Sequence, residues 1–163
     1  MKQIQEITRS IFSLRQKKAL LDCDNYFPQI DRLCIIADRD MHSFLETQYD
    51  ELLENCKKEK IDLFISNPYF ELWLLMHYSD LTEYEETTLL ANKKIGDRTQ
   101  TELYLKAKLG GTYSKKRLLF DYRYKDRIDS AIENSKKYAT SLKELKENIG
   151  TNIGNLLDEL RHR

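Results

Sequence analysis

The stretch LCIIADRD, residues 33–40, and the stretch IDLFISNPYFELWLLM, residues 61–76, decide the fold of this chain. Each begins with a short, continuous apolar run, 33–38 and 61–66, which is typical of a strand buried in a parallel sheet. Residues 42–60 between them carry apolar side chains at helical spacing and end in lysines, which predicts a helix. Strand, helix and strand together predict a right-handed βαβ unit.

The rest of the chain is predicted to be mainly helical. Asn67-Pro68 is expected to open a helix, with Asn67 as its cap, and residues 70–78 are apolar nearly all round, which predicts deep burial. Further helices are expected at 1–20, 85–91, 99–109 and 126–147, and after Thr151. We therefore expect a single mixed α/β domain over residues 1–163, with an α/β core over 1–80 and a mostly helical extension over 81–163.

The composition excludes several classes of protein. The 163 residues include 27 Lys+Arg and 27 Asp+Glu, so the formal net charge is zero and a basic coat protein for nucleic acid is not expected, although a local basic patch remains compatible. Three widely spaced cysteines, Cys23, Cys34 and Cys56, form neither a zinc pattern nor a disulfide framework. No apolar run suits a signal peptide or a membrane span, so we expect a cytoplasmic protein without membrane contact.

Asp38 and Asp40 directly follow the first predicted strand. Residues two apart in extended chain point to the same side, and ligands of open α/β sheets bind at the carboxyl ends of the strands. Two adjacent carboxylates repel each other, and a bound Mg²⁺ relieves that repulsion and can activate water or stabilise a phosphoryl oxygen. The alternative is a polar strand end in which Asp40 stabilises the start of the next helix. The sequence leaves both interpretations open.

Glu71 and His77 are the ionisable groups of the otherwise apolar segment 70–78. A buried carboxylate needs a partner, and Glu71 follows the second strand at the sheet edge that Asp38 and Asp40 share, so it is a candidate to complete or orient a carboxylate cluster. The alternatives are that Glu71 is a first-turn acid favoured by the helix dipole, and that His77 is a core histidine bonded to a backbone carbonyl. These alternatives also stay open.

Residues 112–125, TYSKKRLLFDYRYK, form the densest mixture of basic and aromatic side chains. Lys and Arg neutralise phosphates and aromatic rings stack on unpaired bases, which makes the segment a candidate nucleic-acid contact. An ordinary surface loop with its aromatic rings packed inward is the interpretation that the residues alone slightly favour. The candidates are Tyr113, Lys115, Lys116, Arg117, Tyr122, Arg123 and Lys125.

IIADRD at 35–40, followed by ISNPYFELWLLMHY at 65–78, resembles the RloB-like proteins of bacterial anti-phage defence. That family's pattern is a strand ending in D-x-D and then S-N-P-x-F-E-x-W-L-L-x-H-[FY], matched here without a gap at Ser66, Asn67, Pro68, Phe70, Glu71, Trp73, Leu74, Leu75 and His77. Tyr113-Ser-Lys115-Lys116 is similar to the family's Y-x-K element. Residues 151–157 resemble its closing segment, with Ile149-Gly150 in place of Asn-Pro.

The resemblance implies a Toprim-like fold with a small parallel sheet and a metal-dependent site. It implies that Asp38 and Asp40 hold Mg²⁺, with Mn²⁺ as the alternative. From their places in the sequence we expect catalytic roles for Glu71, as a third ligand or an orienting base, and for His77. We also expect nucleic-acid binding by Tyr113, Lys115, Lys116 and Arg117, and structural or orienting roles for Ser66, Asn67 and Trp73. The sequence departs from the Toprim pattern because no strand ending in Glu-Gly precedes residue 33, so about one βα unit is expected to be missing.

The leading hypothesis is therefore a phage-defence effector of abortive-infection type that works as a Mg²⁺-dependent nuclease. It would hydrolyse phosphodiester bonds of RNA, favoured over DNA, by in-line attack of metal-activated water. The resemblance also implies a partner ATPase of the ABC or AAA type, and self-association into a homo-oligomer is compatible with it. The alternative is a non-catalytic sensor or regulatory subunit that binds the ATPase or a phage component. A small homodimeric module with a nucleotide substrate is a third hypothesis.

Overall fold

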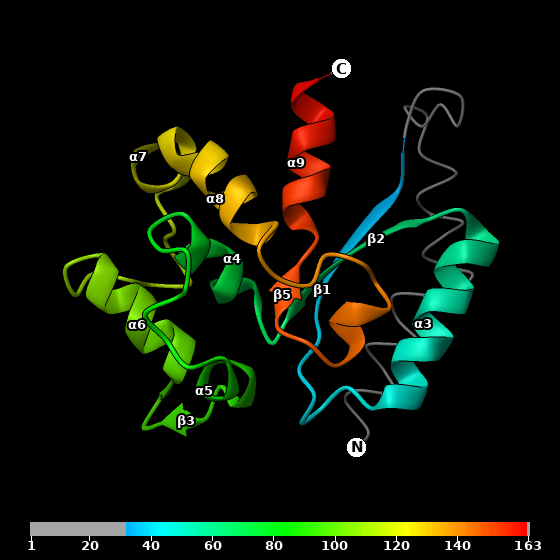
Figure 1. Ribbon diagram of the computed structural model, residues 1–163, viewed down its shortest axis with the longest axis horizontal. Helices are drawn as coiled ribbons and strands as arrows, with labels where there is room; N and C mark the ends of the chain where they lie inside the picture. Colours follow the sequence, from blue (N-terminus) through cyan, green and yellow to red (C-terminus); the bar gives the residue numbers. More distant parts are fainter. Residues whose placement is uncertain (1–31, 163) are drawn as a thin grey trace. The chain divides into compact units, whose positions relative to one another are not determined.

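The computed structural model describes residues 32–162 (Figure 1), so the helix expected at 1–20 and the βα unit expected to be missing before residue 33 lie outside the described residues. The described residues divide into two compact units, one of 32–35 with 41–63 and the other of 36–40 with 64–162. Strands β1 (Cys34–Asp38) and β2 (Asp62–Asn67) each begin in the first unit and end in the second. In this part of the chain no helix is long and apolar enough to cross a membrane.

The predicted parallel strand pair is confirmed. β1 and β2 are neighbours in a three-stranded sheet of order β1-β2-β5, where β5 is Gly150–Thr151. The amide of Asp62 donates to the Leu33 carbonyl over 2.9 Å, and the amide of Arg39 donates to the Ser66 carbonyl over 2.8 Å, so both strands run the same way. Their carboxyl ends therefore lie at the same edge of the sheet. β5 pairs antiparallel with the end of β2 and was not predicted.

The first unit contains the predicted helix between the strands, α3 (Glu46–Glu59). It buries Tyr49, Leu52 and Cys56, which recur at helical spacing. The helix begins after Leu45, whose amide donates to the side-chain oxygen of Gln48 over 2.8 Å. It ends at Lys60, which adopts the left-handed conformation that commonly stops helices. The helix is shorter at its start than the predicted span of 42–60.

The second unit is built around α4 (Phe70–Met76), which packs against α6 (Gln100–Lys108) and α8 (Ile128–Ser135). In turn, α8 packs against α9 (Ile153–Arg161), as Figure 1 shows. The residues from Leu72 to Met76 are each at most 2% exposed. The prediction that this apolar segment is deeply buried is therefore confirmed, and so is the helix-rich second half of a mixed α/β fold.

Two of the shorter predicted helices are also confirmed. α5 (Glu86–Ala91) corresponds to the helix expected at 85–91. α6 corresponds to the helix expected at 99–109, and the Thr99 hydroxyl caps it by accepting from the Glu102 amide over 3.3 Å. Between them, β3 (Lys94–Ile95) and β4 (Arg98–Thr99) form a small hairpin that was not predicted.

The predicted start of α4 is wrong by two residues. Asn67 is the last residue of β2 rather than a helix cap, and Tyr69 precedes the helix. The side-chain amide of Asn67 instead donates to the carbonyls of Leu145 and Asn148, each over 3.0 Å. The Asn67 side chain, which the sequence pattern assigns to the helix start, therefore bonds to backbone carbonyls that are distant in the chain.

The long helix predicted over 126–147 is also wrong, because α8 ends at Ser135. The amide of Ala139 donates to the Ile149 carbonyl over 3.1 Å, so the chain has left the helix to run beside β5. A Cβ atom on Gly150 would lie 2.1 Å from the Ala139 carbonyl oxygen, so only glycine permits this approach. Short 3-10 turns at Lys125–Arg127 and Glu144–Lys146, and the one-turn helix α7 (Phe120–Arg123), complete the unit.

Candidate active site

Asp38 ends β1 against the first residue of α4. Its Oδ1 atom accepts a hydrogen bond from the Phe70 amide over 2.7 Å. Although the residue is exposed to solvent, its pKa is raised to about 6, mainly by loss of hydration and also by the charges of Glu71 and Asp40. The Phe70 amide and the Lys115 ammonium act in the opposite direction. The carboxylates of Asp38, Asp40 and Glu71 are thus close enough to influence one another.

Asp40 contacts the residue just before α4. The Tyr69 hydroxyl donates a hydrogen bond to the Asp40 carboxylate. Burial, followed by this bond and the negative charges of Asp40, Asp38 and Glu71, raises the pKa of Tyr69 well above its usual value, so the phenol remains a proton donor. Both aspartates therefore lie at the amino end of α4, as the strand-end argument predicted. Arg39 between them is 3% exposed and its Nε donates to the Lys146 carbonyl over 3.0 Å.

Glu71 is held by two donors from the segment after α6. The carboxylate is 6% exposed, and its Oε1 accepts from the Tyr113 hydroxyl over 3.0 Å and pairs with Lys115 Nζ over 2.9 Å. Burial raises the pKa of Tyr113, and the Glu71 charge raises it further, so this phenol also stays protonated. Glu71 is thus an ion-paired acceptor in the structure, which limits its use as a third metal ligand or a base.

The same lysine joins Glu71 to a second buried carboxylate, Glu102 of α6. Lys115 Nζ lies 2.7 Å from Glu102 Oε1, and Arg98 Nη1 lies 3.7 Å from Glu102 Oε2. Partial burial lowers the pKa of Lys115, but Glu102 and Glu71 outweigh this effect and leave it raised, so the ammonium stays charged. Sequence reasoning missed Glu102, because an acid in the first turn of a helix is common and needs no special role.

His77 lies in the core of the second unit. The side chain is 1% exposed, its Nδ1 lies 3.0 Å from the Trp73 carbonyl, and its ring meets Trp73 and Tyr124 edge-on at 5.0 and 5.2 Å. Burial lowers the pKa of His77 to about 4, so the ring is neutral near pH 7. His77 therefore corresponds to the alternative interpretation, a core histidine bonded to a backbone carbonyl. At 1% exposure its ring is not accessible to a substrate, which the predicted catalytic role would require.

Ser66, Asn67 and Trp73, predicted to have orienting roles, each contact a different part of the unit. The Ser66 hydroxyl lies 2.9 Å from the Thr151 hydroxyl, which itself donates to the Ile65 carbonyl over 2.9 Å. Asn67 ties β2 to the 145–148 segment, as described above, and Trp73 packs against His77. Asn152, which sequence reasoning missed, accepts from the Ile65 amide through its side-chain oxygen over 2.6 Å. The end of β2 is therefore fixed on the β5 side.

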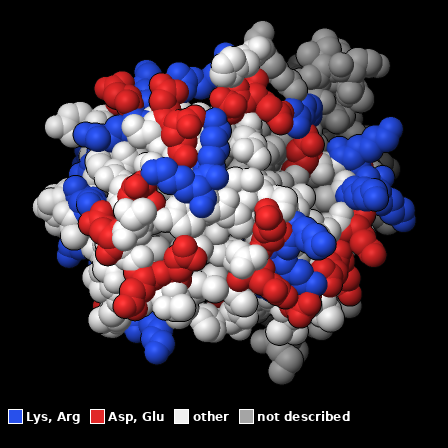
Figure 2. All heavy atoms as spheres, viewed as in Figure 1, with Lys and Arg blue, Asp and Glu red and all other residues white. Residues whose placement is uncertain are grey.

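The four predicted nucleic-acid contacts separate into two pairs. Tyr113 is 4% exposed and, with Lys115, faces the carboxylates of Glu71 and Glu102. Lys116 and Arg117 are exposed to solvent. On the face of the molecule in Figure 2, basic and acidic side chains are interspersed, in line with the zero net charge of the chain. Any electrostatic attraction for phosphates must therefore be local.

The residues present fit one kind of metal site and not another. Among residues 32–162, no group of three or more His, Cys, Asp or Glu side chains is placed to hold a metal ion. Mg²⁺, however, is often bound through one or two carboxylates while it keeps waters and contacts substrate phosphates. Asp38 and Asp40 provide two oxygen donors of this kind. Lost hydration is the main cause of the raised pKa of Asp38, and the charges of Glu71 and Asp40 add a repulsion that a cation would relieve. The pair fits a site in which Mg²⁺ is bound by two carboxylates, by waters and by a phosphate of the substrate.

One family model, described as RloB-like protein, matches residues 2–160 of the chain. Neither the curated proteins nor the solved structures contain a match.

Proposed function

The chain belongs to the RloB-like protein family, and from that premise we propose that it is a phage-defence effector that hydrolyses phosphodiester bonds of nucleic acid. The observation that supports this activity most directly is the meeting of Asp38 and Asp40 at the start of α4, beside Glu71 and the Lys115 ammonium. Two acidic metal donors next to a fixed cation are the groups that phosphoryl transfer uses.

The residues of the chain divide the work of binding and orientation. Asp38 and Asp40 would hold Mg²⁺ or Mn²⁺, which supplies Lewis acidity and a more acidic bound water. The Phe70 amide and the Tyr69 hydroxyl fix the two carboxylates. Lys115, fixed between Glu71 and its second carboxylate partner, places a permanent positive charge near the scissile phosphate. In this proposal Glu71 is a positioning residue for Lys115. RNA is the favoured substrate.

Cleavage of end-labelled RNA and DNA strands in Mg²⁺ or Mn²⁺ tests the proposal. The double variant Asp38→Asn/Asp40→Asn is expected to reduce cleavage to background while the protein stays folded. Asp97→Asn is the matched control, since Asp97 is exposed and lies in the β3-β4 turn of the same unit, and it should cleave as the wild type does. Cleavage that survives in the double variant would refute the site.

A second candidate function is a non-catalytic sensor or regulatory subunit that binds a partner ATPase or a phage component. The pairing of Glu71 with Lys115 and Tyr113 favours it, because this leaves two carboxylates for a metal instead of three. Calorimetric titration with Mg²⁺ and Mn²⁺ separates the two functions. Heat of binding in the wild type that disappears in Asp38→Asn supports the nuclease. Absence of metal heat together with metal-independent binding of the ATPase supports the subunit.

A further inference from the structure

Exposed aromatic side chains are concentrated in one short segment. Among residues 32–162, the large hydrophobic side chains that remain exposed include two aromatic ones, Phe120 at 44% and Tyr122 at 87%, both in α7. Leu119, directly before α7, is 38% exposed. Scattered exposed apolar residues are normal, but a run of them next to one another often marks a binding surface. The feature to be explained is therefore the cluster and not any single residue.

The same segment is basic in a chain without net charge. Residues 115–127 contain six Lys or Arg against two Asp. Several of these bases are engaged: Lys115 with the two glutamates, Arg123 with Thr112, and Arg127 over the Tyr78 ring at 4.9 Å. Within the part of the chain that the structure describes, no ion pair or side-chain hydrogen bond engages Lys116 or Arg117. These two charges are available to a ligand.

The segment also begins at the candidate active site. Lys115 contacts Glu71, and its charge acts on Asp38. Successive Cα atoms are about 3.8 Å apart, so the Cα atom of Arg117 lies within about 8 Å of that of Lys115. A polymer bound at Lys116 and Arg117 would consequently reach the proposed hydrolytic site with its backbone.

We infer that one surface of the protein binds an unpaired nucleic-acid strand. This basic-aromatic surface consists of Lys116, Arg117, Phe120 and Tyr122. The two cations would contact successive phosphates and the exposed rings would stack on bases, which is how single strands are bound without sequence preference. Phe120 stacks one side of its ring on Tyr124 and remains 44% exposed, whereas Tyr122 is 87% exposed. A duplex keeps its bases stacked inside and offers these exposed rings no partner, and an acidic protein would use the cations but not the rings. The inference rests on the proposed function and narrows its substrate to a single strand.

Binding can be measured without catalysis. Fluorescence anisotropy with a labelled 12-nucleotide strand, as RNA and as DNA, and with the matching duplex, is carried out in EDTA so that no metal-dependent cleavage occurs. Wild type is expected to bind both single strands at least about tenfold more tightly than the duplex. Tyr122→Ala should raise the Kd for a single strand about tenfold or more, and Tyr122→Phe should leave it unchanged because the ring still stacks.

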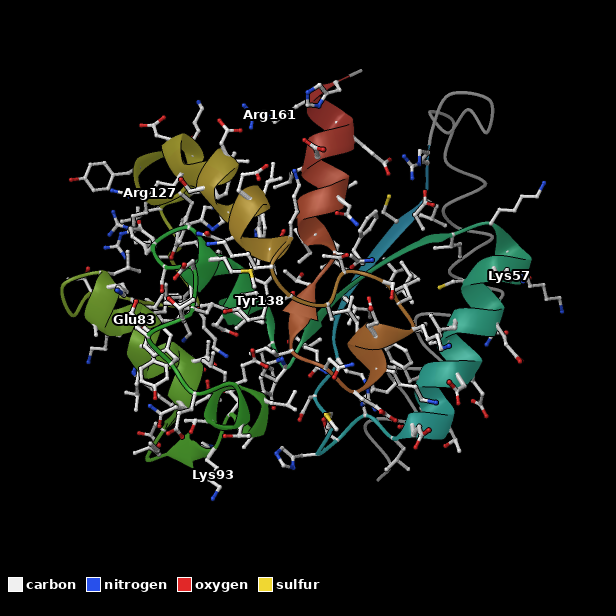
Figure 3. The ribbon with its side chains drawn as sticks, viewed as in Figure 1. Lys57, Glu83, Lys93, Arg127, Tyr138 and Arg161 are labelled. Atoms are coloured by element: carbon white, nitrogen blue, oxygen red, sulfur yellow. The ribbon has the colours of Figure 1, made fainter. Side chains whose placement is uncertain are left out.

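The electrostatic part has its own readout and a matched control. Lys116→Ala/Arg117→Ala should weaken binding and reduce the salt dependence of log K by about 0.7 for each phosphate that the protein no longer neutralises. The control is Lys93→Ala/Lys94→Ala, an exposed lysine pair beside the 52% exposed Ile95, because it matches the charge and apolar exposure without an aromatic ring. Lys93 projects outward from the fold in Figure 3. This control should change the Kd less than twofold.

The outcomes separate this inference from the proposed function. Strand binding that depends on Tyr122, without cleavage in Mg²⁺, would support the basic-aromatic surface and refute the nuclease. Cleavage in Mg²⁺, together with strand binding that Tyr122→Ala does not change, would support the nuclease and refute the basic-aromatic surface as a strand-binding site. In that case the surface would be assigned to binding of a protein partner. Equal binding of duplex and single strands would also overturn the inference. Thermal melting of each variant checks the fold, which substitution at so exposed a side chain should preserve.

Discussion

The two ends of α4 place ionisable side chains in opposite environments. At its start, Glu71 is 6% exposed but bonds to Tyr113 and Lys115, and the carboxylates of Asp38 and Asp40 lie beside it. At its end, His77 is 1% exposed, is neutral and is surrounded by aromatic rings. The helix is seven residues long, so a single short element connects a charged edge to an apolar core.

This difference shows why burial alone does not identify a candidate functional residue. Both side chains are buried and polar, and both belong to the segment that resembles the RloB-like pattern. What separates them is the partner: an ammonium that itself reaches solvent for Glu71, and a backbone carbonyl of the same helix for His77. A group that touches only its own core can stabilise the fold but cannot act on a substrate. Substitutions at each end should therefore affect different properties.

The largest effect on stability is expected in the core, at Trp73. The side chain is 2% exposed and packs edge-on against His77. Trp73→Ala should lower the free energy of unfolding by about 3–5 kcal/mol, because it removes a large buried side chain and leaves a cavity. Urea unfolding followed by circular dichroism measures the change. Trp73→Phe, which keeps a ring in place, should be clearly less destabilised, and equal destabilisation of both variants would contradict this packing.

The next largest effect should appear on acidification, through His77. Its pKa is about 4 in the folded chain and 6.5 without perturbation, so the unfolded chain binds more protons between these values. Stability should therefore be complete above pH 6.5 and fall as the pH drops toward 4, by on the order of 3 kcal/mol. The difference in pH dependence between wild type and His77→Phe isolates this contribution. Identical curves for both proteins would show that the ring is not buried as a neutral group.

Lys115 tests the charged end of α4. Lys115→Met leaves the buried carboxylates of Glu71 and Glu102 without their shared cation and should lower the free energy of unfolding by about 1–3 kcal/mol. This is less than for a fully enclosed pair, since the lysine side chain is 56% exposed. Lys116→Met is the matched control and should change stability by less than about 0.5 kcal/mol. Restoration of stability by adding Glu71→Gln to Lys115→Met would confirm the unpaired carboxylate as the cause.

The sequence was sufficient to predict structure where the signal is local. The apolar runs 33–38 and 61–66 correctly predicted the two parallel strands. Residues 70–78 are apolar on nearly all sides, which correctly predicted that α4 is buried. The side chain of Asn67 was assigned wrongly because its partners, Leu145 and Asn148, are distant in the chain. The helix predicted over 126–147 was wrong for the same reason. Ala139 pairs with the distant Gly150, which lacks the Cβ atom that would prevent this approach, and the chain therefore runs beside β5.

The candidate site shows the same division between local and distant information. The position of Asp38 and Asp40 could be predicted from the sequence, because residues that follow parallel strands lie at the same edge of the sheet. The second carboxylate on Lys115 could not be found, because Glu102 is separated from Glu71 by 31 positions and belongs to an ordinary helix start. Single-sequence patterns report spacing within an element, whereas ion pairs between α4 and α6 depend on tertiary packing.

The smallest change in stability is expected at the residue most important for the proposed activity. Asp38→Asn keeps an oxygen that accepts from the Phe70 amide and removes a charge that is poorly hydrated and repelled by Glu71 and Asp40, so at pH 7 it should raise the free energy of unfolding. The gain should stay below about 1 kcal/mol, because Asp38 is exposed and solvent screens its charge. The pKa of Asp38 rises from 3.8 to about 6 on folding, so the folded chain binds more protons in this interval. In EDTA, wild-type stability relative to Asp38→Asn should therefore fall as the pH rises from about 4 to about 6, opposite in sign to the contribution of His77. A relative stability that rises over this interval would mean that Asp38 gains a partner on folding instead of losing hydration.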